Sequence, residues 1–217
     1  MTRSFPVDGI LFDSDGVLVN SLEVAMAVWR EWGKIWTPGF DPTVNFPHGT
    51  PARDIIAQWV SPEDHPAALQ AIEKMEVAES HRMPEIPGAV AFTESLPAQR
   101  WVVVTSAGRE LAVPRLANAG HNPTRMITAE DVTLGKPSPD PYLRGAQLLG
   151  LEPSRVAVFE DAAVGVEAAR AAGAGLVVGV GNKLDPTTVD VLIPDLRHVR
   201  RIPSDEGILL EFSPEPR

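Results

Sequence analysis

The chain has 217 residues, 44% of them hydrophobic, which is enough to fill one large domain or a domain with a smaller one attached. Its formal charge of −10 disfavours nucleic acid and membrane surfaces as partners, because both carry negative charge. The absence of cysteine excludes disulfides and thiolate zinc sites, and no apolar run approaches the roughly 18 residues needed to cross a bilayer.

The first predicted element is a strand over residues 7–12, and a long region without strands comes after it. From residue 20 to about residue 83, apolar residues recur at helical spacing in SLEVAMAVWREWGKIW, PARDIIAQWV and PEDHPAALQAIEKMEVAESH. Trp29, Trp32 and Trp36 share this spacing and are expected to form a small core. We therefore predict an all-helical domain of residues 17–86, inserted into a core made of residues 1–16 and 87–217.

Strands and helices alternate in the rest of the chain. Further strands are expected at residues 100–106, 125–128, 155–160, 175–180 and 189–193. Helical patterns lie between them at residues 88–96, 111–120, 140–150 and 163–173. This alternation is typical of a parallel sheet covered by helices on both faces, so we predict an α/β fold.

Polar side chains come directly after four of the predicted strands. Ligands of open parallel sheets bind beyond the carboxyl ends of the strands, so these side chains are expected to converge. Taken singly, none is strong evidence of a site, because a turn, a helix N-cap or a solvated loop lysine explains each of them at least as well. The residues are Asp13 and Asp15 after the first strand, Thr105 and Ser106 after the second, Lys136 in the loop after the third, and Glu160 and Asp161 at the end of the fourth.

The four carboxylates of this group pose a charge problem. Residues i and i+2 of an extended strand point to the same side, so Asp13 and Asp15 are expected to share one small space with the Glu160–Asp161 pair. Carboxylates packed together cannot all remain ionised unless a cation binds. Lys136 supplies one positive charge, and Mg²⁺, which prefers oxygen ligands, would supply the rest. Such a cluster suits a phosphoryl group, whose oxygens need neutralising while a nucleophile approaches.

Four stretches in this order, DSDGVLVNS, VVVTSAG, GKPSPDPY and VAVFEDAAVG, resemble the motifs of the phosphatase branch of the haloacid dehalogenase superfamily. FPHGTPARD and GAQLLGLEPSRVAVFEDA are similar to bacterial sugar phosphatases of the glycerol-phosphate and 2-deoxyglucose-6-phosphate type, which are related to β-phosphoglucomutase. The resemblance implies a Rossmann-like parallel sheet with an inserted helical cap, and Mg²⁺-dependent hydrolysis of small phosphorylated sugars or polyols. Because the chain lacks cysteine, a signal peptide and a long apolar patch, we expect a cytoplasmic monomer.

The resemblance also implies roles for the residues at the strand ends. Asp13 would be the nucleophile that forms an aspartyl-phosphate, and Asp15 would act first as general acid and then as general base. Thr105 and the backbone N–H of Ser106 would hold phosphoryl oxygens. Lys136 would pair with both the phosphate and Asp13. The implied ligands of Mg²⁺ are Asp13, the backbone carbonyl of Asp15, Asp161 and, directly or through water, Glu160.

The stretch FPHGTPARD resembles the specificity loop of the family's cap. The residues expected to contact the sugar are His48, Gly49, Thr50 and Arg53. Gly49 would permit a close approach of the backbone to the substrate. A histidine hydrogen-bonded within its own loop explains His48 equally well, and the start of a helix explains Arg53.

Two positions depart from the family pattern. Asn20 stands where the family usually has an aspartate, which removes a charge at that position. Ala25 stands where related sugar-phosphate mutases carry a cap histidine. Without that proton-handling group, hydrolysis is favoured over the mutase alternative.

Proteins of other classes fit the sequence less well. A haloacid dehalogenase proper attacks carbon and needs neither Asp15 nor a magnesium site. A phosphoacceptor signalling domain needs no cap, and a catalytically silent binding protein has no need of the complete set of motif residues. A nucleotide dehydrogenase is excluded because Leu184 stands where its third fingerprint glycine would be, and a zinc hydrolase because the five histidines show no HExxH spacing.

Overall fold

The computed structural model describes residues 2–45, 51–204 and 207–214. Its centre is a six-stranded parallel sheet in the order β4-β3-β2-β5-β6-β7. Each strand lies within one of the six predicted strand regions, and the predicted α/β fold is confirmed. The strands are β2 (Gly9–Phe12), β3 (Trp101–Val104), β4 (Met126–Ile127), β5 (Val156–Glu160), β6 (Leu176–Val180) and β7 (Val191–Ile193).

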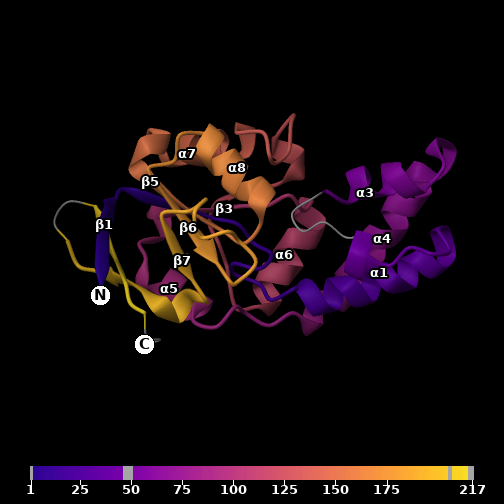
Figure 1. Ribbon diagram of the computed structural model, residues 1–217, viewed down its shortest axis with the longest axis horizontal. Helices are drawn as coiled ribbons and strands as arrows, with labels where there is room; N and C mark the ends of the chain where they lie inside the picture. The colour runs from indigo at the N-terminus through magenta and orange to yellow at the C-terminus, as the bar shows by residue number, and fades with distance from the viewer. Residues whose placement is uncertain (1, 46–50, 205–206, 215–217) are drawn as a thin grey trace.

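Helices cover both faces of this sheet, with α7 and α8 on the side opposite α5 (Figure 1). Neighbouring residues of β2 point to opposite faces, so Phe12 packs against Phe92 of α5 while Leu11 shares a cluster with Tyr142 of α7. These helices are α5 (Ala89–Ser95), α6 (Arg109–Asn118), α7 (Asp140–Leu149) and α8 (Ala163–Ala171). Short 3₁₀ helices lie at Pro62–Asp64, Ser80–Arg82, Ala98–Arg100, Ala129–Asp131, Pro153–Arg155 and Leu196–His198.

The structure adds a three-stranded antiparallel sheet that the sequence patterns do not predict. It consists of β1 (Arg3–Val7), β9 (Ile208–Phe212) and β8 (Val199–Ile202), in that order across the sheet. Charged residues in β1 and β8, and Pro6 in β1, weaken the strand signal in the sequence. A proline is tolerated there because β1 is an edge strand. Leu210 and Phe212 of β9 belong to the same hydrophobic cluster as Phe12, so this sheet extends the main core.

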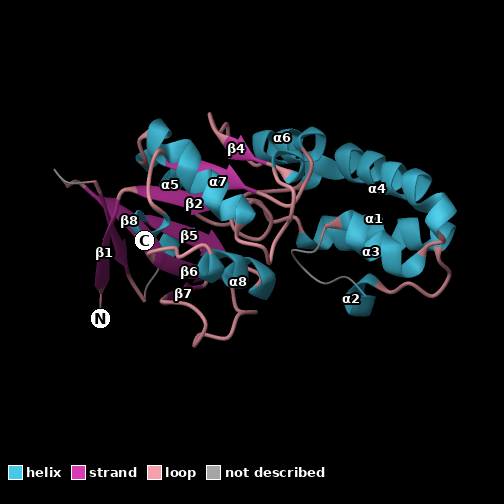
Figure 2. Ribbon diagram, turned by 90° about the horizontal axis from the view of Figure 1, so that it is seen from above, coloured by secondary structure: helices cyan, strands magenta, loops and turns pink. Residues whose placement is uncertain are grey.

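A separate group of helices lies beside the α/β layers (Figures 1 and 2). It encloses its own hydrophobic cluster, in which the rings of Trp29 and Trp32 are fully buried and 5.1 Å apart. Trp36 packs against this cluster from a partly exposed position. The division of the chain at residues 17 and 86 stays a prediction. The helices are α1 (Leu22–Trp36), α2 (Pro42–Asn45), α3 (Ala52–Trp59) and α4 (His65–Glu79).

The two chain segments that lead into and out of this helical group run side by side. The backbone N–H of Asn20 donates to the carbonyl of Pro84 (2.8 Å), and that of Ile86 donates to the carbonyl of Leu18 (2.9 Å). Leu18 is fully buried in the main core, whereas Asn20 is exposed. These bonds pair the two connecting segments, and α6 contacts the helical group as well, through an ion pair between Arg115 and Glu76 of α4 (3.1 Å). Among the described residues, no helix is both long and apolar enough to cross a membrane.

Candidate active site

Strand β2 ends at Phe12, and the turn after it places Asp13 at the carboxyl end of the sheet. The backbone N–H of Asp13 donates to the carbonyl of Phe159 in β5 (3.0 Å), which holds the two strand ends together. Gly16 is required in this turn, because its φ is +87° and a Cβ there would lie 2.2 Å from Oδ2 of Asp161. The turn therefore brings the carboxylate after β2 against the acidic residues at the end of β5.

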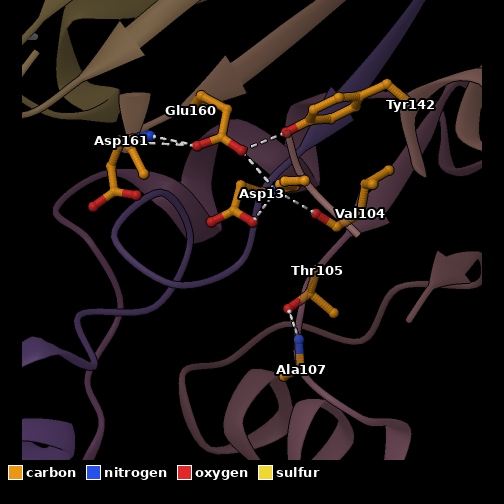
Figure 3. A network of polar contacts seen from close by, with 9 residues as sticks. Asp13, Val104, Thr105, Ala107, Tyr142, Glu160 and Asp161 are labelled. Carbon is orange, nitrogen blue, oxygen red and sulfur yellow. Dashed lines mark hydrogen bonds and ion pairs between the residues drawn. The ribbon is translucent and has the colours of Figure 1, made fainter. Parts of the chain in front are cut away.

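Lys136 is buried and contacts Asp13, Val104 and Glu160, which Figure 3 labels. Its Nζ donates to Oδ1 of Asp13 and to Oε1 of Glu160, both at 2.6 Å, and to the carbonyl of Val104 at 3.2 Å. The hydroxyl of Tyr142 donates to the same Glu160 oxygen at 2.6 Å. The prediction that Lys136 pairs with Asp13 agrees with this geometry, while the contact with Tyr142 was not predicted.

The ionisation of these side chains is strongly displaced by their surroundings. Burial raises the pKa of Asp13 well above its ordinary value, and the ammonium of Lys136 opposes that rise. Burial, with repulsion from Glu160, raises the pKa of Asp161 to about 7. For Lys136, desolvation acts to lower the pKa, but the carboxylates of Asp13 and Glu160 outweigh it, so its pKa rises and it stays charged.

The three acidic side chains fit a hard divalent cation. Oxygen atoms of Asp13, Glu160 and Asp161 all lie within 4.8 Å of one another, and carboxylates are ligands that Mg²⁺ prefers. One buried ammonium, that of Lys136, faces these three groups, and the half-exposed Lys183 lies 3.8 Å from Asp161. A divalent cation would balance the remaining negative charge.

A cavity of about 770 Å³ opens in front of Asp13, between the sheet end and the helical group. Thr105 and Ser106, which come directly after β3, line this cavity, and their binding of phosphate stays a prediction. The hydroxyl oxygen of Thr105 accepts a hydrogen bond from the N–H of Ala107 (3.1 Å), which also makes it part of the turn after β3 (Figure 3). Helices α1, α3 and α4 contribute Trp29, Arg53 and Glu76 to the opposite wall.

Comparison with known proteins places this geometry in a family. Residues 7–173 match the model of the haloacid dehalogenase-like hydrolases. The chain belongs to the haloacid dehalogenase-like hydrolase family. It is 35% identical to glycerol-1-phosphate phosphohydrolase 2 of Saccharomyces cerevisiae, over 84% of this chain and 78% of that one. It is 37% identical to hexitol phosphatase A of Escherichia coli, over 78% of this chain and 81% of that one. The crystal structure of a hydrolase from Pseudomonas syringae superposes with a TM-score of 0.78, at 22% identity, covering 87% of this chain and 94% of that one.

In this haloacid dehalogenase-like hydrolase, the side chain of Asp15 differs in position from the sequence-based prediction. Its carboxylate is not among the three that cluster; Oδ1 instead accepts a hydrogen bond from Nη1 of Arg115 in α6 (2.9 Å). The rule that residues i and i+2 share a side applies within an extended strand, and β2 already ends at Phe12. Asp15 still lines the same cavity as Asp13.

The predicted specificity residues are only partly placed. His48, Gly49 and Thr50 lie outside the described residues. Arg53 is exposed near the start of α3, where its Nε lies 3.6 Å from the carboxylate of Asp54, and it lines the cavity. Ala25, which the resemblance aligned with a histidine of the mutases, is buried in α1 and also lines the cavity.

Three polar side chains near the hydrolase site were missed by the sequence patterns, namely Tyr142, Arg115 and Glu76. For Arg115 and Glu76, the sequence did contain a pattern that indicates a buried charge. Arg115 shares the buried face of α6 with Leu111, and Glu76 continues the buried row of Ile72 in α4. A charged residue on an otherwise apolar helix face indicates a buried ion pair. Two such residues of opposite charge on different helices indicate that they pair with each other.

Proposed function

We propose that the protein is a Mg²⁺-dependent phosphomonoester hydrolase that acts on small phosphorylated sugars or polyols through an aspartyl-phosphate on Asp13. The observation that carries this proposal is the buried Asp13 carboxylate, held 2.6 Å from Lys136 and open to a cavity of about 770 Å³. Two relatives, a glycerol-1-phosphate phosphohydrolase and a hexitol phosphatase, support the substrate class by their names.

The first step is attack of an Asp13 oxygen on the phosphorus of the ester. As that bond forms, the bond to the alcohol oxygen breaks, and Asp15 protonates the departing oxygen. Lys136 favours the ionised form of Asp13, against the effect of burial, and places positive charge beside the phosphoryl oxygens. The hydroxyl of Thr105 and the N–H of Ser106 hold these oxygens from the other side.

The second step regenerates the enzyme. Asp15, now ionised, removes a proton from a water molecule, and the resulting nucleophile attacks the phosphorus of the aspartyl-phosphate. Inorganic phosphate leaves, and Asp13 returns to its carboxylate form. Asp13, Asp161, Glu160 and the backbone carbonyl of Asp15 would hold Mg²⁺, which supplies positive charge to the phosphoryl oxygens when bound.

The helical segment of residues 17–86 acts in this proposal as a cap. It forms one wall of the cavity and so excludes water from the transfer step, which protects the aspartyl-phosphate from premature hydrolysis. The sugar or polyol portion lies against this wall, where Arg53 is available to contact it, together with the predicted contacts of His48, Gly49 and Thr50. The absence of cysteine fits a cytoplasmic enzyme.

A phosphate-release assay over a panel of phosphorylated sugars, polyols and glycerol phosphate, with Mg²⁺ and again with a chelator, tests the proposal. Phosphate is expected only with Mg²⁺, and Asp13→Asn is expected to abolish it. Asp41→Asn, a change of the same type at an exposed position in the helical segment, should leave the rate unchanged. An inactive panel in both conditions contradicts the proposal, and isomerisation of a sugar phosphate without phosphate release indicates the mutase alternative.

A further inference from the structure

Two charged side chains are buried outside the carboxylate cluster and face each other across the cavity wall. Arg115 of α6 is 5% exposed and Glu76 of α4 is 6% exposed. Arg115 comes from the α/β part of the chain, and Glu76 comes from the helical segment of residues 17–86. Their contact therefore joins the two parts of the structure at the level of the proposed reaction site.

The contacts form a continuous chain that ends on Asp15. Nη1 of Arg115 donates to Oδ1 of Asp15 at 2.9 Å, and Nη2 of Arg115 lies 3.1 Å from Oε1 of Glu76. The same Glu76 oxygen accepts a hydrogen bond from Nε1 of Trp29 at 3.2 Å. Trp29 is fixed in turn within the hydrophobic cluster of the helical segment. The orientation of the Asp15 carboxylate thus depends on groups from α6, α4 and α1.

This arrangement is poorly explained as a device for stability. A buried guanidinium and carboxylate lose their hydration, and a well-packed apolar pair in their place is often at least as stable. Nε of Arg115 is also shielded from solvent without a hydrogen-bond acceptor among the described residues. Its Nη2 is shielded as well, and its contact with Glu76 is an ion pair without a hydrogen bond, so the guanidinium's hydrogen bond among the described residues is the one to Asp15.

We propose that Arg115 is a positioning residue that fixes the Asp15 carboxylate for proton transfer, and that Glu76 anchors Arg115 from the helical segment. This inference rests on the proposed function, in which Asp15 protonates the leaving alcohol. A carboxylate that rotates freely reaches the leaving oxygen in only a fraction of its conformations, so fixing it accelerates the step that needs its proton.

If Arg115 positions the proton donor, its loss should matter only for substrates whose leaving group must be protonated. Glycerol phosphate releases an alkoxide that must be protonated as it leaves, whereas p-nitrophenyl phosphate releases a phenolate that is stable without a proton. The parameter kcat/KM reports the steps up to departure of the alcohol, before the aspartyl-phosphate is hydrolysed. Loss of Arg115 should therefore lower kcat/KM for glycerol phosphate far more than for p-nitrophenyl phosphate.

The experiment measures kcat/KM of both esters, with Mg²⁺, for wild type, Arg115→Met, Glu76→Gln and Asp15→Asn. Since general acid catalysis contributes about 10²- to 10⁴-fold, Arg115→Met is expected to lose roughly 10- to 100-fold with glycerol phosphate and less than about 3-fold with p-nitrophenyl phosphate. Glu76→Gln keeps an acceptor for Trp29, so it should also lose more kcat/KM with glycerol phosphate than with p-nitrophenyl phosphate, but by a smaller factor. Asp15→Asn removes the proton donor itself, so it should show the largest difference between the two esters in lost kcat/KM.

Arg109→Gln is the matched control. Arg109 begins the same helix, and its side chain pairs with Asp131 on the exposed surface, so neither ester should be affected. The positioning role would be overturned if both variants, Arg115→Met and Glu76→Gln, lost equal activity with the two esters, or if neither variant lost activity. If Arg115→Met fails to fold, the result for Glu76→Gln decides. Wild-type protein that hydrolyses neither of these esters nor any other member of the panel contradicts the proposed function itself, and with it the role of Arg115; if a different alkyl phosphate is the substrate, it takes the place of glycerol phosphate.

Discussion

The ammonium of Lys136 lies 2.6 Å from the carboxylate of Asp13, and both side chains are buried at the carboxyl end of the parallel sheet. A charge pair removed from water in this way is costly to break, because the surviving partner has no hydration to return to. Glu160, on the other side of the ammonium at 2.6 Å, adds a second carboxylate that depends on the same lysine.

Lys136→Met is therefore expected to lower the free energy of unfolding in the presence of a chelator by about 3–5 kcal/mol. Urea denaturation checks this. Lys34→Met is the matched control, since Lys34 is paired with Glu31 at the same 2.6 Å but both side chains are more than half exposed. An exposed pair contributes little, so that change should cost about 0.5 kcal/mol or less. Equal costs at the two sites would show that burial does not decide the strength of the Lys136 pair.

The raised pKa of Asp161, about 7, predicts how metal and pH act together on stability. A carboxyl whose pKa is raised by folding binds its proton more tightly in the folded than in the unfolded protein. The free energy of unfolding therefore falls as the pH rises from the ordinary pKa of an aspartate, 3.8, through about pH 7. Without a divalent cation, the thermal midpoint should fall between pH 5 and pH 8. Mg²⁺ favours the ionised form, so it should raise the midpoint more at pH 8 than at pH 5.

Asp161→Asn is the control for that measurement, because it removes the titrating group. The variant should lose the part of the pH dependence that Asp161 contributes, while the raised pKa of Asp13 keeps another part, and it should lose stabilisation by Mg²⁺ at pH 8. A chelated wild type whose midpoint rises steadily from pH 5 to pH 8 would contradict the raised pKa.

The convergence of the site residues was predictable because parallel strands bring the residues after their carboxyl ends to one edge of a sheet. Asp13, Lys136 and Glu160 come together in the structure by this rule, although they are far apart in sequence. The direction of the Asp15 side chain was not predictable, since it depends on a turn with a left-handed Gly16 and on an arginine one hundred residues away. Alternation within a strand says nothing about side chains in the turn beyond it.

The parallel arrangement of the central strands was implied by their alternation with helices, but the second sheet was not. Strand β9 pairs with β8 on one side and with β1, which is remote in sequence, on the other. Local patterns carry little of that information, because the propensity of a strand depends on its cross-strand neighbours. The buried charges of α4 and α6 carried a local signal, a charged residue on an apolar helix face, but the sequence did not show that these two helices contact each other.

Tyr142 offers a spectroscopic test of the buried network, since it is the single tyrosine of the chain. Burial, and after it the nearby charge of Glu160, raises the pKa of its hydroxyl well above the ordinary value of 10. The folded protein should therefore show no tyrosinate absorbance at pH values where an exposed tyrosine is ionised, and the signal should appear only when alkali unfolds the chain. Tyr142→Phe identifies the signal by removing it. A titration near pH 10 with the fold intact would show that the Tyr142 hydroxyl is not held as described.

Gly165, in the first turn of α8, tests how closely the helix must approach Glu160. A Cβ on Gly165 would lie 1.8 Å from Oε1 of Glu160, the atom that accepts from both Lys136 and Tyr142. Gly165→Ala must therefore displace the Glu160 carboxylate, although alanine is the better residue for a helix. Displacing a metal ligand or its support commonly weakens metal binding, so the Mg²⁺ concentration for half-maximal phosphate release should rise about 10- to 100-fold.

Gly173→Ala is the control that shows the general effect of replacing a glycine without a steric clash with Glu160. Gly173 lies after the same helix with φ of +78°, and no atom lies within 4 Å of a Cβ built there. The substitution should cost about 1 kcal/mol of stability through backbone strain and leave the Mg²⁺ requirement unchanged. If Gly165→Ala also kept the wild-type Mg²⁺ requirement, the Glu160 carboxylate could move without consequence, and its position between Lys136 and Tyr142 would not matter for the metal.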